Sequence, residues 1–108
     1  MKSALGEFEH HVLLAALHLG PDAYSAEIVL ALEQLIERDV APAAVYIALR
    51  RLEENGLVES EMRLAEGAGG TRERRYFEVT EEGLVVLRRS RSRFLRLWSG
   101  LEMLLAED

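Results

Sequence analysis

The amino-acid sequence predicts a mainly α-helical protein with one small β-hairpin. Apolar residues recur at helical spacing in four separate segments. Only between Val58 and Val79 does the spacing change to an alternation of apolar and polar residues, and the glycine-rich stretch 67–71 interrupts it as a hairpin turn would. The 108 residues, of which 49% are hydrophobic and 30% charged, suffice for one globular core but not for two.

Composition excludes several functional classes. The chain has no cysteine, so it can form neither disulfides nor thiolate metal sites. Acidic residues follow Met1 within the first nine positions, which argues against a secretory signal. The longest uncharged apolar run, 12–17, is far shorter than the ~20 residues of a membrane-spanning helix. We therefore expect a cytoplasmic protein.

Charge is distributed unevenly along the chain. The formal net charge is −6, yet residues 50–98 carry eleven arginines against nine acidic residues. Residues 1–49 have seven acidic residues against two basic ones, and the last ten residues have three acidic residues and no basic one. Because phosphate contacts act within a Debye length of ~8 Å, the location of the arginines matters more than the total charge. The acidic balance lowers non-specific affinity for nucleic acid without excluding it.

The first predicted helix spans residues 5–19 and ends at Gly20-Pro21. Its inward face consists of Leu5, Phe8, Val12, Ala15, Ala16 and Leu19. Three further leucines widen the apolar surface beyond one stripe, so part of this helix needs a second covering surface. We therefore assign Leu13 and Leu17 to a subunit interface. The helix also carries His10, His11 and His18, but no further ligands converge with them, and we expect no metal site.

Two more helices follow in close succession. The second is predicted to begin at Tyr24-Ser25, with Ser25 as the N-cap. The third is predicted from Pro42, which suits a first helical position, to Gly56, which suits the left-handed residue that closes a helix. The link 38–41 is short and the third helix is the more cationic of the two. This arrangement is typical of a helix-turn-helix.

The two faces of the third helix differ in chemistry. An apolar seam is formed by Val45, Leu49 and Leu52. The opposite face carries Ala43, Ala44, Tyr46, Ile47, Arg50 and Arg51. Small residues at its start and arginines further on would allow this helix to enter a major groove ~12 Å wide. Taken alone, the pattern also fits an ordinary amphipathic surface helix.

The alternating segments after Gly56 predict two strands, 58–64 and 74–79, joined by the glycine-rich turn. Arg72, Arg74 and Arg75 crowd beside this turn. A glycine run with arginines also suggests a phosphate-binding loop, but it lacks the Gly-Lys-Ser/Thr ending and does not open into a helix. An arginine-bearing hairpin beside a recognition helix suits the minor groove of DNA better.

A final helix is predicted from the N-cap Thr80 to about Glu107, a length of ~40 Å. A heptad seam interrupted only by Arg91 comprises Leu84, Leu87, Phe94, Trp98, Leu101 and Leu105. We expect this seam to pair with the same helix of a second chain, although the helix could instead fold back on its own domain. The expected division is thus a DNA-binding domain of residues 1–80 and a dimerisation helix of residues 81–108.

Several segments, in this order and spacing, resemble the winged helix-turn-helix regulators of the PadR family. They are Leu5-Gly-Glu-Phe-Glu9, Tyr24-Ser-Ala-Glu-Ile28, Val45-Tyr46, Arg51-Leu-Glu-Glu-Asn-Gly-Leu-Val58 and Arg75-Tyr-Phe-Glu-Val-Thr-Glu-Glu-Gly83. The resemblance implies a homodimeric transcriptional repressor, of the short type with one C-terminal helix, often acting on stress, phenolic-acid or efflux genes. The alanine-rich stretch Ala41 to Ala44 departs from a typical recognition helix, because it offers few hydrogen-bonding groups to base edges.

We therefore expect a homodimeric regulator of a pseudo-palindromic DNA operator, with no cofactor and no reaction centre. The expected DNA-binding residues are Tyr24, Ser25, Ala43, Ala44, Tyr46, Ile47, Arg50, Arg72, Arg74 and Arg75. The expected interface residues are Leu13, Leu17, Leu84, Leu87, Phe94, Trp98, Leu101 and Leu105. Phe94 and Trp98 either fill the dimer core or bracket a planar aromatic effector that relieves repression. The second possibility is similar to some short PadR-like proteins, which bind planar compounds between paired helices. The alternative function is a winged-helix protein-interaction module without DNA binding.

Overall fold

The computed structural model describes residues 5–106, which form helices and a three-stranded antiparallel sheet. The helices are α1 (Glu7–Leu19), α2 (Ser25–Ile36), α3 (Pro42–Glu54), α4 (Glu81–Trp98) and α5 (Glu102–Leu105), with a 3-10 turn η1 (Gly20–Asp22) after α1. The strands are β1 (Ala23–Tyr24), β2 (Val58–Gly67) and β3 (Gly70–Val79). The predicted fold class, mainly helical with a small β-hairpin, is confirmed.

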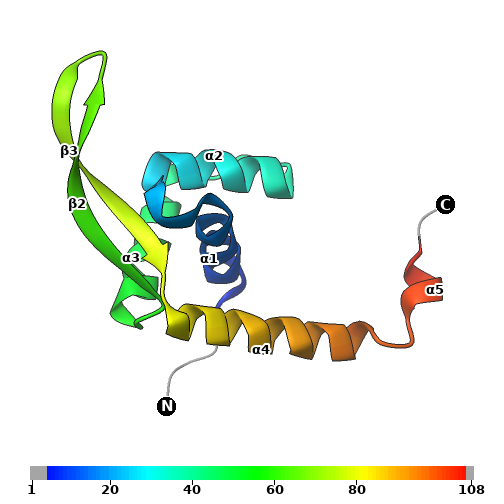
Figure 1. Ribbon diagram of the computed structural model, residues 1–108. Coiled ribbons are helices and arrows are strands. Elements are labelled where there is room, and N and C mark those ends of the chain that lie inside the picture. The colour runs from blue at the N-terminus through cyan, green and yellow to red at the C-terminus, as the bar shows by residue number, and fades with distance from the viewer. Residues whose placement is uncertain (1–4, 107–108) are drawn as a thin grey trace.

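The core lies where α1, α2 and α3 meet the base of the hairpin. Its largest fully buried side chains are Phe77, Leu13, Ile28, Leu32, Leu49, Leu52, Val12, Val45 and Val58. Helix α1 crosses between α2 on one side and the first half of α4 on the other (Figure 1). Each such side chain contributes roughly 1.5–3 kcal/mol when it is fully removed from water. One side of α3 packs into this core, and the opposite side of the helix faces solvent.

Helix α3 begins and ends as its sequence predicts. Pro42 occupies the first position after the N-cap Ala41, which makes no side-chain cap hydrogen bond. At the other end Gly56 has a left-handed φ of 77°. The backbone N–H of Gly56 donates to Glu53 O at 3.0 Å, and that of Leu57 donates to Leu52 O at 2.9 Å. These two bonds are those of a Schellman C-cap, so the chain leaves α3 directly into β2.

The hairpin extends well beyond the core (Figure 1). Each strand has 10 residues, and Gly67 pairs with Gly70 across a two-residue turn. Ten residues of strand span ~33 Å. The hairpin therefore forms a projecting wing.

A third strand, β1, is not predicted by the sequence pattern. It pairs with the outer edge of β3, with Ala23 opposite Phe77 and Tyr24 opposite Tyr76. A two-residue strand has no alternation to detect. The prediction that Ser25 is an N-cap is wrong, because the helix already includes Ser25 and its N-cap is Tyr24, without a side-chain cap bond.

Helix α4 has the predicted N-cap but not the predicted length. Thr80 Oγ1 accepts a hydrogen bond from Gly83 N at 3.0 Å and donates one to Gly56 O at 2.7 Å. The helix ends at Trp98 after 18 residues, and Gly100 with φ 86° turns the chain before α5. The prediction of a single helix of ~40 Å is thus wrong, since a residue with left-handed φ interrupts the segment. Its predicted end near Glu107 lies outside the described residues.

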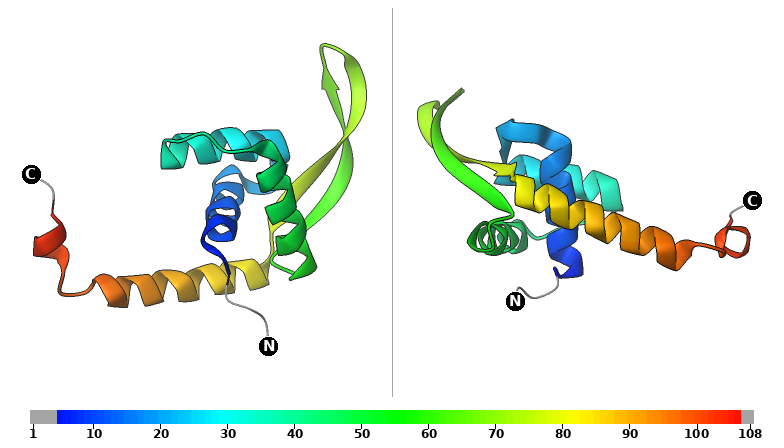
Figure 2. Two further views of the ribbon diagram at one scale, coloured as in Figure 1. Left: turned by 180° about the vertical axis from the view of Figure 1, so that it is seen from behind. Right: turned by 60° about the horizontal axis from the view of Figure 1, so that its bottom comes forward.

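The two ends of α4 have different surroundings. Its first half packs on the domain, where Gly83, Leu87 and Ser90 are buried. Its second half and α5 project away from the domain (Figure 2). From Arg91 to Ala106 every residue is exposed. The first half of α4 therefore shares the core of the winged domain, and the division into two domains at residue 80 stays a prediction.

Candidate nucleic-acid interface

Helix α3 presents the face that its sequence predicts. The seam residues Val45, Leu49 and Leu52 are fully buried. On the opposite side Ala43, Tyr46, Ile47 and Arg50 are exposed, and Ala44 is half-buried. Tyr46 is 45% and Ile47 52% exposed, so neither side chain is used by the core. The first two turns of this face are apolar, and its cations begin at Arg50.

A chain of polar contacts connects the end of α3 with the wing. Arg50 Nη1 lies 3.8 Å from Glu53 Oε1 on the same helix. Glu53 Oε2 accepts a hydrogen bond of 2.6 Å from Ser60 Oγ on β2. Ser60 Oγ in turn accepts one of 2.9 Å from Arg75 Nη1 on β3. Arg75 therefore lies on the side of the wing that faces α3, and Glu53 and Ser60 connect it to Arg50 on that helix; both arginines are predicted DNA contacts.

The opposite side of the wing carries a stack of arginines and tyrosines. The guanidinium of Arg74 lies 3.9 Å from the ring centroid of Tyr24, and that of Arg63 lies 3.9 Å from Tyr76. The two tyrosine rings meet edge to face with centroids 5.8 Å apart. Arginine over a tyrosine face is a favourable cation–π geometry. Tyr24 and Arg74, both predicted DNA contacts, are thus neighbours in one cluster.

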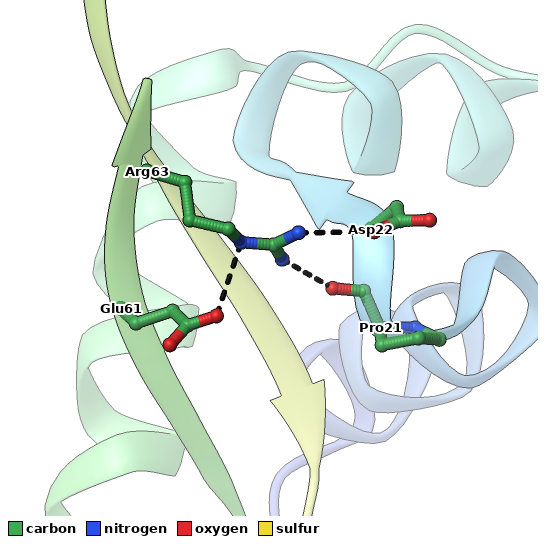
Figure 3. A network of polar contacts seen from close by, with 4 residues as sticks. All are labelled: Pro21, Asp22, Glu61 and Arg63. Atoms are coloured by element: carbon green, nitrogen blue, oxygen red, sulfur yellow. Dashed lines mark hydrogen bonds and ion pairs between the residues drawn. The ribbon is translucent and has the colours of Figure 1, made fainter. Parts of the chain in front are cut away.

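Arg63 anchors this side of the wing to the loop after α1 (Figure 3). Its Nη1 donates to Asp22 Oδ1 at 3.0 Å and its Nη2 to Pro21 O at 2.7 Å. Its enclosed Nε lies 3.1 Å from Glu61 Oε1, close enough for an ion pair but out of line for a hydrogen bond. The sequence places Arg63 only on a polar strand face. Its partners 41 and 42 positions away could not be inferred without β1.

The three arginines near the turn do not form one cluster. Antiparallel register places Arg72 opposite Ala65 and Arg74 opposite Arg63, on the face that carries Tyr76. Arg75 lies opposite Met62, on the face toward α3. The three arginines that crowd beside the turn in the sequence are thus divided between the two faces of the wing. Arg72 is exposed and the nearest of the three to the turn, and its side chain has no hydrogen-bond or ion-pair partner within residues 5–106.

A second feature is an apolar groove of about 1020 Å³ between α1 and α4. Its lining includes Leu14, Leu17, Leu84, Leu87, Phe94 and Trp98, together with several arginines of α4. At its inner end His10 Nε2 and Ser90 Oγ lie 2.7 Å apart in a hydrogen bond between the two helices. Five of the predicted interface residues thus line one groove.

The remaining predicted interface residues lie elsewhere. Leu101 and Leu105 are 41% and 52% exposed on the segment after α4. Leu13 is fully buried in the core of its own chain, so its assignment to a subunit interface is wrong. The helical pattern alone could not show that Leu13 is buried in the core while Leu14 and Leu17 are exposed and line the groove.

Other kinds of site find no support in the described part of the chain. Among residues 5–106 no three His, Asp or Glu side chains are placed to hold a metal ion. None of the helices in this range has the length and apolar character needed to cross a membrane.

The exposed recognition helix beside an arginine-bearing wing defines a winged helix-turn-helix protein of the kind that regulates transcription. Residues 13–89 match the model of the Transcriptional regulator PadR-like family, and the chain belongs to that family. It is therefore a transcriptional regulator with a DNA-binding fold, and not an enzyme. No curated protein matches the sequence significantly.

Solved structures agree with this assignment. A PadR family transcriptional regulator from Eggerthella lenta is 31% identical, with a TM-score of 0.63 over 90% of this chain and 82% of that one. A PadR-like transcription factor from Bacteroides fragilis is 22% identical, with a TM-score of 0.69 over 90% and 88%. A PadR-like regulator from Bacillus cereus is 21% identical, with a TM-score of 0.68 over 94% and 93%. The latter two similarities concern the fold.

Proposed function

We propose that the chain is a homodimeric repressor that binds a pseudo-palindromic operator through α3 and the wing. The observation that carries the proposal is the exposed face of α3, which the core leaves free from Ala43 to Arg50. In a winged helix-turn-helix this face enters the major groove. Arg72 at the end of the wing is then free to contact phosphate or an adjacent minor groove. Further contacts are assigned to Tyr24, Ser25 and Arg74 beside the wing face turned away from α3, and to Arg75 on the face toward α3.

The apolar surface of α1 and α4 supports the two-fold dimer. Phe94, Leu97 and Trp98 are 53%, 66% and 52% exposed on the projecting part of α4. Contiguous exposure of this kind in a soluble chain marks a surface for a partner. A second copy brings an identical projecting helix, which can lie along the groove of the first chain while its own groove is covered in return. The dimer would present two α3 helices about one turn of DNA, ~34 Å, apart.

The same groove supports an effector site. Phe94 and Trp98 line it one helical turn apart, so each dimer would hold two such pairs. Arg88, Arg91 and Arg93 also line it, against the single carboxylate of Glu7. This balance favours a flat aromatic anion over a flat aromatic cation. Binding of such a compound between the subunits would alter the separation of the two α3 helices and release the operator.

The central experiment measures binding to the DNA upstream of the protein's own gene at two salt concentrations, against random duplex of equal length. Specific binding with a steep salt dependence is expected. Arg72→Ala should reduce the slope of log K against log salt by about 0.9, because one phosphate contact is lost. Arg96→Ala, a control on the projecting part of α4, should leave the slope unchanged.

The rival function is a protein-interaction module that keeps the fold but not DNA binding. The acidic net charge of −6 favours it. Equal affinity for promoter and random duplex at low salt, with Arg72→Ala indistinguishable from the wild-type protein, would support this rival and refute the repressor.

A further inference from the structure

The side chains that α3 offers to a major groove are unusual in lacking hydrogen-bonding groups. The exposed residues of its first two turns are Pro42, Ala43, Tyr46 and Ile47, and the first charged side chain is Arg50. Base edges are contacted mainly by the N-terminal residues of a recognition helix. Apart from the Tyr46 hydroxyl, these residues can make only apolar contacts there. This chemistry restricts which base pairs the helix can accept.

The exposed apolar face is not a displaced part of the core. Val45, Ala48, Leu49 and Leu52 fill the core side of α3 and are at most 4% exposed, while Ile47 is 52% exposed. Ala43 and Ile47 are four residues apart, so their side chains lie one above the other on the helix surface. Arg50 follows Ile47 by three residues on the same surface. A cation beside an apolar pair suits a duplex, whose phosphates flank the base edges.

In the major groove only thymine presents an apolar group, its C5-methyl. The remaining groups in the major groove, thymine O4 included, are hydrogen-bond acceptors or amino donors. Apolar side chains placed over those groups would remove them from water without giving them a partner, which disfavours binding. When the same side chains lie over a thymine methyl, apolar surface of both the protein and the base is removed from water. The two alternatives therefore differ in sign as well as in magnitude.

We propose that Ala43 and Ile47 determine sequence specificity by contacting thymine methyl groups, so that each operator half-site has A·T pairs where the start of α3 lies. Arg50 then contacts the adjacent guanine or phosphate. This inference rests on the proposed function, because it requires α3 to enter the major groove. It adds the class of base that the helix selects and the residues that select it.

The test removes the methyl group alone. A tightly bound half-site is first selected from random duplexes, and each of its thymines is then replaced singly by uracil, which keeps every hydrogen-bonding group of the base. For the wild-type protein, uracil at one or two positions should weaken binding about three- to fivefold per methyl group, the value of one buried methyl. Uracil outside the half-site should have no effect.

Variants at Ile47 identify the side chain responsible. At one of the sensitive positions, the Ile47→Ser variant should bind the duplex with thymine and the duplex with uracil equally tightly. Ile47→Val, which retains a branched apolar surface, should keep the preference for thymine. Arg50→Ala should weaken both duplexes by the same factor and leave their ratio unchanged. Both positions are exposed, so the melting temperatures of the three variants should stay close to that of the wild-type protein.

The outcomes separate the inference from the proposed function. Tight, specific binding that is the same for thymine and uracil duplexes overturns the inference and leaves the repressor intact. A thymine preference that persists undiminished in Ile47→Ser at every sensitive position assigns the selectivity to another group and also overturns the inference. Absence of binding to any duplex overturns the repressor together with the inference.

Discussion

Ser60 Oγ on β2 donates a 2.6 Å hydrogen bond to Glu53 Oε2 at the end of α3, and so connects the wing to the recognition helix. Short O–H···O⁻ bonds of this length are charge-assisted and stronger than neutral ones. Glu53 also lies 3.8 Å from Arg50, and Ser60 accepts a bond from Arg75. A displacement of the wing therefore changes the surroundings of the first cation on the exposed face of α3.

Removal of the hydroxyl in Ser60→Ala should destabilise the protein. Glu53 and Arg75 both lose a partly buried partner, and a bond to a charged group contributes roughly 1.5–3 kcal/mol. The free energy of unfolding should fall by about that amount in denaturant titrations at fixed protein concentration.

A double-mutant cycle with Glu53→Gln isolates the Ser60–Glu53 contact. The coupling energy should be at least about 1 kcal/mol, since the two groups are in direct contact. Strictly additive effects of the two substitutions would show that the contact contributes nothing to stability.

Much of the fold follows from local sequence signals. Pro42 and Gly56 delimit α3, Thr80 caps α4, and the alternation around the glycine-rich turn marks the wing. Each of these features depends on residues close together in the chain. The burial of Val45, Leu49 and Leu52 follows equally from their spacing on one helix.

The features that the sequence does not predict depend on distant partners or on competing local preferences. Pairing of Ala23 with Phe77 creates β1, and the position of Arg63 depends on that strand. The heptad seam continues across Gly100, but a glycine that readily adopts positive φ ends the helix there. Leu13 and Leu14 are adjacent leucines, and only tertiary packing decides which of them is buried.

Gly83→Ala should destabilise the winged domain. Gly83 is buried in the first turn of α4, and an added Cβ would overlap the carbonyl oxygen of Leu57 and lie 2.8 Å from Val79 Cγ1. The backbone at Leu57 is held by its bond from Thr80 N and cannot move freely. Overpacking of this kind costs about 1–3 kcal/mol. Thermal unfolding measures it, with Gly67→Ala as the matched control, because a Cβ there meets no atom within 4 Å. Equal melting temperatures for the two variants would contradict the close approach.

Arg63→Ala should loosen the base of the wing. Asp22 and Pro21 lose their donor and Tyr76 loses its stacked guanidinium, while β1 keeps only its pairing with β3. The side chain of Arg63 is 37% exposed, so the expected loss of stability is modest, about 1 kcal/mol. The specific readout is faster amide hydrogen exchange at residues 23–24 and 76–77. Arg72→Ala on the same strand pair should leave this exchange unchanged, and unchanged exchange in Arg63→Ala would refute the anchoring role.

Leu17→Asp should dissociate the proposed dimer. Leu17 lines the groove between α1 and α4, where a second copy would bury the new carboxylate without a partner. A penalty of ~3 kcal/mol corresponds to an association about 100-fold weaker. Sedimentation of the wild-type protein at micromolar concentration should give a dimer and that of Leu17→Asp a monomer. Leu30→Asp is the matched control, because Leu30 is 62% exposed on α2 and does not line the groove. A wild-type monomer, or equal dissociation by both variants, would refute this interface.

Trp98 provides a direct test of the proposed effector site, because it is the only tryptophan of the chain and lines the groove together with Phe94. Titration with a flat aromatic carboxylate should change its emission, whereas the matched aromatic amine should bind more weakly, since Arg88, Arg91 and Arg93 outnumber Glu7 in the lining. Stacking on each ring adds ~0.5–1.5 kcal/mol, so Phe94→Ala should weaken carboxylate binding roughly two- to twelvefold while leaving Trp98 in place to report it. Unchanged emission with every compound, in a protein whose operator binding is also unaffected, would mean that both rings serve only to fill the dimer core.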